Sequence, residues 1–213
     1  MPRSLPDILY NSVYKNKEVD SNNALYKLEF YKSTRYFENY DCYQKFLHAV
    51  ENSVRTDDRY KNYISYLKKN VKLDKCQVYK NVTDEDATIE MHHGPVFTLF
   101  DICAIVLEYF IYKQWEINTF IIADAVLEEH EKNRVQVVMV SSTVHEQIHN
   151  GDIFINIHQA WGDLNAFVKK YECVLDTNDY IKQLNNYIDR SLLYDSTDFS
   201  VLDLNPKLYK KNE

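Results

Sequence analysis

The sequence predicts an α+β fold, in one compact unit with a helical extension, and three observations lead to this prediction. Apolar residues recur at helical spacing near both ends of the chain, and short β-prone runs lie between them. Only 3 glycines and 4 prolines occur in 213 residues, so composition marks no linker between separate domains. Contents of 45% hydrophobic and 27% charged residues are ordinary for a globular protein, and this length suffices to bury a core.

The first part of the chain, residues 1–75, is expected to be mainly helical. Residues 41–54 (DCYQKFLHAVENSV) and 57–70 (DDRYKNYISYLKKN) carry aromatic and aliphatic side chains at helical spacing. Each run begins with aspartate, a residue that is favoured where helices start. The run ALYKLEFYK at 24–32 alternates apolar and polar residues instead, which predicts a strand.

Residues 76–157 are expected to form the central part of the fold. CQVYKNV (76–82) and ATIEMHH (87–93) are short β-prone runs that are separated by the polar turn TDED. Together they predict a hairpin that carries His92 and His93 at its end, where a Gly-Pro pair stops the strand.

Two helices are predicted within residues 97–132, as an insertion in this central part. Thr98 followed by Asp101 resembles a capping box and predicts the start of a helix that runs to about Tyr112. Thr119 is expected to open the second helix, FIIADAVLEEHEK. An insertion of this size costs little stability, because the entropy of closing a loop grows only logarithmically with its length.

A second strand and a short helix are predicted after the insertion. VQVVMV (135–140) is almost entirely apolar, as expected for a buried strand. Ser141 or Ser142 is expected to cap the helix TVHEQIH, which the Asn-Gly pair at 150–151 ends. DIFINI (152–157) then predicts the start of a further strand.

The last part, residues 158–213, is expected to be helical, with helices near 161–171 and 178–190. Aromatic residues here and in the run 26–37 could stack on nucleic-acid bases, as in proteins that bind single strands. Burial in the core is the better expectation for them and for Trp161, because it is the usual place of aromatic side chains at helix or strand spacing.

The sequence disfavours membrane, secreted and disulfide-rich proteins. The opening MPRSLPDILYNS lacks the apolar stretch of a signal peptide, and the most apolar segment is interrupted by Asp101 and Glu108, so no membrane span is expected. The 4 cysteines show no CxxC spacing, which favours buried free thiols in a reducing cytoplasm. Richness in Tyr, Asn, Lys and Ile fits an AT-rich phage or low-GC bacterial genome. We therefore expect a cytoplasmic protein, in the host cytoplasm if a phage encodes it.

The net charge of -7 argues against a strong nucleic-acid binder, because binding to phosphates requires Lys and Arg. The charge is unevenly distributed, however. The segment from Arg55 to Lys80 contains 8 basic and 3 acidic residues, which leaves a local basic face open as an alternative to an ordinary exposed helix.

The segment HEQIH matches the HExxH signature of zinc metallopeptidases. On a helix, His145 and His149 would share one face and could grip a metal, while Glu146 deprotonates a water. The helix is too short for this class, and the third ligand is missing at the expected spacing, with Glu172 only a remote candidate.

The order strand, strand, helix with these histidines resembles the HNH family of nucleases, also called the His-Me finger or ββα-metal family. Their pattern is ExHH, a central Asn, and then HxxxH followed by Gly. The resemblance covers residues 76–157. The matching residues are Glu90, His92, His93, Asn133 or the better spaced Gln136, His145, His149 and Gly151.

This resemblance implies a ββα-metal core and a metal-dependent endonuclease that hydrolyses phosphodiester bonds in DNA. It places His92, His145 and His149 as metal ligands, His93 as the general base that activates water, and Asn133 as a further catalytic residue. The cofactor would be a divalent metal ion (Zn, Ni, Mn or Mg), and three imidazoles favour Zn, Ni or another transition ion over Mg. The implied partner is nucleic acid, with a protein partner or a homodimer left open.

Two alternatives remain beside the nuclease. One is an inactive structural or interaction protein that keeps the HNH fold, which the acidic charge and the imperfect Asn position favour, and the other is the HExxH peptidase. Among the other histidines, His48 and His158 are assigned to structure. His130 is expected to be a solvated residue at a helix end, although it lies close enough to Asn133 in sequence to approach the site.

Overall fold

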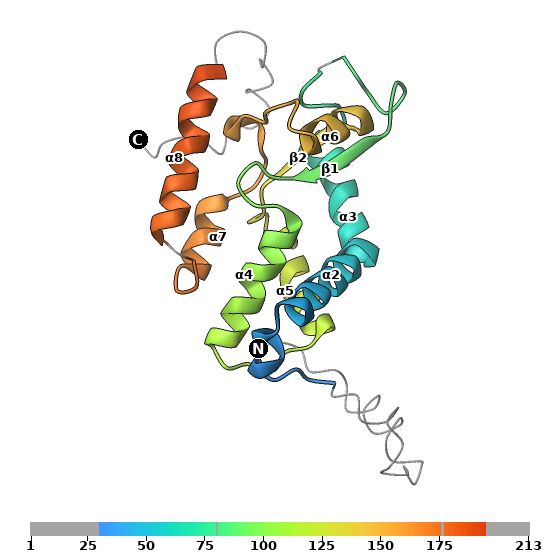
Figure 1. Ribbon diagram of the computed structural model, residues 1–213. Coiled ribbons are helices and arrows are strands. Elements are labelled where there is room, and N and C mark those ends of the chain that lie inside the picture. The colour runs from blue at the N-terminus through green and yellow to red at the C-terminus, as the bar shows by residue number, and fades with distance from the viewer. Residues whose placement is uncertain (1–29, 80, 176, 195–213) are drawn as a thin grey trace.

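The computed structural model describes residues 30–79, 81–175 and 177–194, and within them helices surround a small two-stranded sheet (Figure 1). This mixture of helices and one antiparallel sheet agrees with the predicted α+β class. The sheet and α6 lie at one end of the molecule, and the turn between α4 and α5 lies at the other (Figure 1).

The first part of the described chain is helical, as predicted. It contains η2 (Thr34–Glu38), α2 (Tyr40–Thr56), α3 (Asp58–Tyr66) and the π-helical turn η3 (Leu67–Val71). Asp57 caps α3, because its carboxylate accepts a hydrogen bond from the N–H of Arg59. Asn39, which was not predicted, caps α2 in the same way through the N–H of Cys42. The strand predicted at 24–32 is wrong for residues 30–32, and its residues 24–29 lie outside the described residues.

The sheet consists of β1 (Ile89–His93) and β2 (Val137–Ser141), which run antiparallel with His92 opposite Val138. The prediction of a hairpin between 76–82 and 87–93 is therefore wrong, because β1 pairs with β2 instead. The helix α6 (Ser142–His149) follows β2 directly and packs against both strands. Both predicted ends of this helix are confirmed, because Ser141 is its N-cap residue and Asn150 is its C-cap residue.

Gln77 covers the second edge of β2 beside Met139. The backbone N–H of Gln77 donates to the carbonyl of Met139 at 2.8 Å, and the N–H of Met139 donates to Gln77 Oε1 at 2.6 Å. A side-chain amide thus replaces a third strand, and the edge is left without free backbone groups at this position.

The same edge of β2 also explains why the predicted strand at 152–157 is wrong. Trp161 occupies the position beside Val137, with both backbone N–H···O distances at 2.8 Å. The chain can approach so closely because Gly162 follows, since a Cβ at Gly162 would lie 2.0 Å from the carbonyl oxygen of Val135. Residues 153–156 therefore run as a loop into the short helix η4 (Ile157–Gln159).

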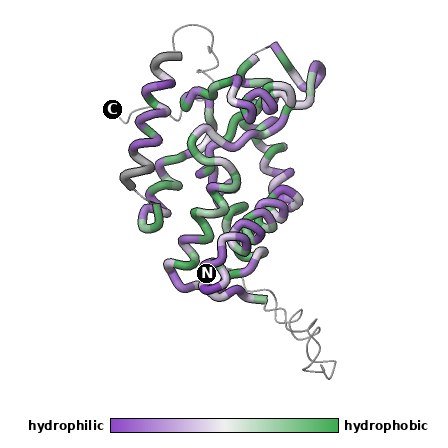
Figure 2. The backbone as a smooth tube through the Cα atoms, in the orientation of Figure 1, coloured by the Kyte–Doolittle hydropathy of each residue, from purple (hydrophilic) through white to green (hydrophobic). Residues whose placement is uncertain are grey.

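The predicted insertion forms α4 (Leu99–Tyr112) and α5 (Thr119–Glu131), and the capping box of Thr98 with Asp101 is present. Asn118, one residue before the predicted start, caps α5 through the N–H of Ile121 at 2.9 Å. The apolar residues of α4 lie in the middle of the molecule, whereas the outer helices α2 and α8 are more polar (Figure 2).

The chain continues with the predicted helices α7 (Leu164–Tyr171) and α8 (Thr177–Tyr194). A fully buried carboxylate ties α5 to α7. Glu129 accepts hydrogen bonds from Lys170 and from the hydroxyl of Tyr171 at 3.1 Å, and Arg134 lies 3.2 Å from it. Such a charge is stable in the interior only because it is paired on several sides.

One hydrophobic core connects the three predicted parts, since Val50, Val106 and Phe167 belong to the same cluster of buried side chains. The boundaries at 75 and 157 stay a prediction. All four cysteines are free thiols, but only Cys76 and Cys103 are buried as predicted, whereas Cys42 is half-buried and Cys173 is exposed. Among the described residues, no helix is both long enough and apolar enough to cross a membrane.

Candidate metal centre

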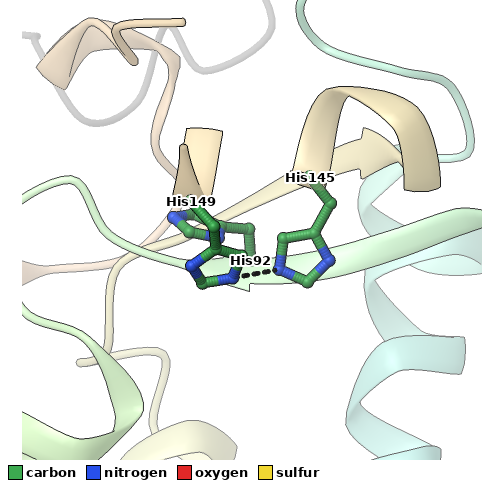
Figure 3. A group of neighbouring side chains, drawn as sticks. All are labelled: His92, His145 and His149. Atoms are coloured by element: carbon green, nitrogen blue, oxygen red, sulfur yellow. Dashed lines mark hydrogen bonds between the residues drawn. The ribbon is translucent and has the colours of Figure 1, made fainter. Parts of the chain in front are cut away.

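Three histidines from β1 and α6 face one another at the end of the molecule that contains the sheet (Figure 3). His145 and His149 are four residues apart on α6 and therefore share one helix face. His92 projects from β1 towards them, with its ring centroid 5.1 Å from that of His145 and 5.2 Å from that of His149. The structure thus brings together the three residues that the sequence predicted as metal ligands.

The ring nitrogens of these histidines are close enough to share one cation. One nitrogen from each ring can be chosen so that all three lie within 4.8 Å of one another. The Nε2 atoms of His145 and His149 are 3.1 Å apart. Tetrahedral zinc with bonds of ~2.1 Å separates two ligand nitrogens by about 3.4 Å. The arrangement is therefore close to that of a bound transition-metal ion.

Glu90 orients His145. The Nδ1–H of His145 donates to Glu90 Oε2 at 2.6 Å, so the Nε2 of a neutral ring is unprotonated and directed at His149. Glu90 and His92 lie on the same face of β1, because alternate residues of a strand point to the same side. Carboxylates behind metal-binding histidines commonly fix the ring in this manner. The sequence pattern contained Glu90, but its role became evident only from the contact with α6.

Within the described residues, His92 combines burial with a ring nitrogen that has no hydrogen-bond partner, as a metal-binding histidine would. It is 8% exposed, and its Nδ1 is buried without a hydrogen-bond partner in the described part of the chain. Burial, together with the nearby rings of His145 and His149, lowers the pKa of His92 to about 4. A neutral imidazole is the form that binds metals, so this buried nitrogen fits a cation well.

Gly94 determines how close the backbone comes to the ring of His92. Its φ of +149° is a conformation that other residues rarely adopt, and a Cβ at this position would lie 3.2 Å from His92 Nε2. The glycine that ends β1 therefore leaves the space in which the His92 ring lies.

The three histidines become more exposed from the strand to the end of the helix. His92 is nearly buried, the side chain of His145 is 22% exposed, and His149 is exposed. Three protein ligands with one side open to solvent leave a coordination position for water or substrate, which is the property that separates catalytic from structural zinc sites.

His93 points to the opposite face of β1 from His92. Its Nε2 lies 2.9 Å from His130 Nε2, and its ring stacks on Tyr60 with centroids 6.1 Å apart. The expectation that His130 is solvated is wrong, because its exposure is 0%. The sequence did contain a signal for this burial: His130 lies four residues after Val126 and eight after Ile122, on the apolar face of α5.

Asn133, predicted as catalytic, lies in the turn after α5 with φ +52°, and its Oδ1 accepts a hydrogen bond from Trp161 Nε1–H at 3.2 Å. No contact within the described ranges joins Asn133 to the three histidines. Gln136, the alternative, is also buried, and its carbonyl accepts the N–H of Gly94 at 3.1 Å. The structure therefore does not bring Asn133 and the predicted metal ligands together.

The HExxH residues are arranged differently from the peptidase expectation. The helix α6 has 8 residues, and Glu146 on it is exposed. The third residue of the cluster is His92 from a strand, whereas Glu172 is an exposed residue at the end of α7. His48 is also exposed, on α2, where it lies 3.8 Å from a carboxylate oxygen of Glu51.

Four of the eight basic residues between Arg55 and Lys80 are paired with acidic ones in the described part of the chain. The pairs within this group are Arg55 with Glu51 at 2.8 Å, Arg59 with Asp124 at 2.7 Å, Lys61 with Asp58 at 3.0 Å, and Lys68 with Asp84 at 3.0 Å. Paired cations contribute less to phosphate binding, so these pairs favour the alternative of an ordinary exposed helix over a basic face.

Comparison with known proteins identifies a phage family. The model of the bacteriophage G278-like virion protein family matches residues 3–212 of the chain. No curated protein and no solved structure matches the chain. The predicted phage origin is confirmed by this match, which covers nearly all of the 213 residues. The chain belongs to the bacteriophage G278-like virion protein family.

Proposed function

We propose that this virion protein is a metal-dependent endonuclease that hydrolyses phosphodiester bonds in DNA at an HNH-like ββα centre. The convergence of His92, His145 and His149 from a strand and the following helix is the observation that supports the proposal most directly. The antiparallel order of β1 and β2 with α6 packed on them agrees with the topology that the HNH resemblance implies.

The residues of this centre have separate roles in the proposed reaction. His92, His145 and His149 would hold a divalent ion, and Glu90 keeps the His145 ring in the orientation that ligation needs. A bound ion supplies Lewis acidity, which neutralises charge on the phosphate and lowers the pKa of water. His93 is the proposed general base, since it is the histidine next to a ligand in the ExHH pattern. Three imidazoles favour Zn or Ni, while Mn and Mg remain candidates.

A scaffold that binds metal without cleaving DNA is the second candidate. His93 is only 5% exposed and is hydrogen-bonded to a buried histidine, and the amide of Asn133 is bonded to Trp161. These two contacts restrain His93 and Asn133, the residues that the nuclease would need as its base and as its catalytic amide. In that case the ion would link β1 to α6 and stabilise the fold. The binding partner of the protein would be another virion protein or a second copy of the chain.

A plasmid assay separates the two candidates. Supercoiled DNA is incubated with the protein and Mg, Mn, Ni or Zn, and nicked or linear product is expected with at least one ion. His145→Ala should abolish cleavage and metal binding together, and His93→Ala should abolish cleavage alone. His48→Ala, an exposed histidine on α2, serves as the matched control. Intact plasmid under every ion, with metal still bound, would favour the scaffold.

The peptidase alternative has its own test. Casein is incubated with the zinc-loaded protein and with Glu146→Gln, which removes the carboxylate that would act as base. Cleavage of casein that the substitution abolishes would replace the nuclease proposal. The location in the host cytoplasm and the DNA substrate are parts of the nuclease proposal and depend on the plasmid result.

A further inference from the structure

A second pair of histidines lies inside the molecule, on the other side of β1 from the candidate metal centre. His93 comes from β1 and His130 from the last turn of α5, with exposures of 5% and 0%. Their Nε2 atoms are 2.9 Å apart, which is a hydrogen-bonding distance. Two buried rings in this position must be arranged as one donor and one acceptor.

The backbone of α5 determines which ring is the donor. His130 Nδ1 lies 2.8 Å from the carbonyl oxygen of Val126. Because a carbonyl can only accept, His130 carries its proton on Nδ1. Burial lowers the pKa of His130 to about 4, so the ring is neutral near pH 7 and its Nε2 is unprotonated.

The protonation of His93 then follows. An unprotonated His130 Nε2 can only accept, so His93 must donate through an Nε2–H. A neutral ring with its proton on Nε2 has its remaining lone pair on Nδ1. A chain of two hydrogen bonds thus runs from β1 to the backbone of α5.

We propose that His130 is a positioning residue that holds His93 in the Nε2–H tautomer, so that Nδ1 is the atom with which His93 acts. The choice of tautomer stands on the two hydrogen-bonding distances and on the complete burial of the His130 ring, which keeps that ring neutral. Its consequence for catalysis rests on the proposed nuclease function, in which His93 is the base.

The surroundings of the pair restrain both rings. Tyr60 stacks on His93 and presents its ring to His130 with centroids 5.6 Å apart, and Tyr63 makes an edge contact with His130 at 5.4 Å. Side chains from α3 therefore close the pocket around the two histidines. Rotation of either ring about its χ2 angle would break a buried hydrogen bond and leave a buried polar atom without a partner.

Two substitutions at position 130 separate positioning from packing. His130→Gln can place its Oε1 where the Nε2 acceptor lies, and its amide N–H can donate to Val126. His130→Leu replaces the ring with an apolar side chain of similar size that offers no hydrogen-bond acceptor. Proton-coupled ¹⁵N NMR of the imidazoles, near pH 7, reports directly which nitrogen of His93 carries the proton. The wild-type chain and the Gln variant should show Nε2–H, whereas the Leu variant should show a mixture or Nδ1–H.

Nuclease kinetics give a second readout if the protein cleaves plasmid. His130→Leu should lower kcat by at least ~100-fold with KM and metal affinity unchanged, because a histidine base held in the wrong tautomer loses on the order of 10⁴ in kcat. His130→Gln should restore most of that loss. A merely structural role would lower both variants' stability without this difference between them.

A failure of the tautomer inference can be distinguished from a failure of the proposed nuclease function. If plasmid stays intact with wild-type protein, the nuclease proposal fails and the NMR result still decides the tautomer. The inference is overturned if wild-type His93 carries its proton on Nδ1, or if the Leu variant keeps the Nε2–H form unchanged. Should His130→Leu fail to fold, the wild-type and Gln spectra are sufficient for this decision.

Discussion

Glu90 on β1 and His145 on α6 are joined by a hydrogen bond of 2.6 Å between Oε2 and Nδ1, so two residues that are 55 positions apart in sequence meet at the candidate metal centre. The contact leaves the Nε2 of a neutral His145 facing His149. The orientation of one ligand is thus fixed by the protein before any ion binds, which lowers the entropic cost of binding.

Replacing Glu90 tests this orientation. Glu90→Gln should weaken zinc or nickel binding by about 10–100-fold, because partners behind metal-bound histidines typically contribute this much to affinity. Affinity is measured by competition with a chromophoric chelator. Glu146→Gln, an exposed carboxylate next to His145 on the same helix, is the control and should bind metal normally. Equal affinities in the two variants would show that Glu90 does not orient a ligand.

Gly94→Ala should displace a ligand without removing one. The new methyl group would meet His92 Nε2 at 3.2 Å, so the ring must shift and the metal affinity should fall by at least ~10-fold. Gly151→Ala provides the comparison, because that residue also has a positive φ (+79°) but its added Cβ meets nothing within 4 Å. Both variants should lose about 1–2 kcal/mol of stability from the backbone conformation alone. Only the first should lose affinity in a calorimetric titration.

The helices and two of the three clustered histidines could be predicted from local sequence signals. Periodicity and capping residues such as Thr98 and Asp101 act within one helix, so they are visible without knowing the fold. His145 and His149 are likewise four residues apart on one helix. Only the placement of His92 beside them needed a family resemblance, since it depends on the pairing of β1 with β2.

The errors concern contacts between distant segments. Cys76 to Val82 has β-prone residues, but the N–H of Gln77 donates to Met139 on the edge of β2, and the N–H of Cys76 donates to Val82 in the same segment, so neither pairs with residues 87–93. Whether a short apolar run becomes a strand depends on which sheet edge is free, and this is not encoded locally. The expectation for His130 is wrong for another reason. Its position at a helix end indicates exposure, whereas its apolar spacing on α5 indicates burial, and the residue is buried.

Metal binding should stabilise the folded chain measurably. At a free zinc concentration of 100 times the Kd, the free energy of unfolding should rise by about 2.7 kcal/mol, provided that the unfolded chain does not bind the ion. Urea unfolding with zinc and with a chelator measures the difference. His145→Ala should abolish this stabilisation, whereas His48→Ala should retain it, because His48 lies on α2, outside the three-histidine cluster. Equal stabilisation of the two variants would mean that zinc binds elsewhere.

The buried histidine His130 should make the metal-free protein less stable in mild acid. Its folded-state pKa is about 4, below the ordinary value of 6.5, because burial disfavours the charged ring. The unfolded chain therefore binds a proton more readily than the folded chain between these two values. The stabilisation is complete above about pH 6.5 and is lost as the pH falls towards 4, by roughly 3 kcal/mol in total.

His130→Gln removes this titrating group while keeping an acceptor for His93. Urea unfolding in the presence of a chelator, at pH values from about 7 to about 5, should show a smaller loss of stability in the Gln variant than in the wild-type chain. Part of the pH dependence should remain, because burial also lowers the pKa of His92 and of His93. Parallel pH profiles for the two proteins would mean that His130 is already accessible to protons in the folded state, contrary to its complete burial against Val126 and Tyr63.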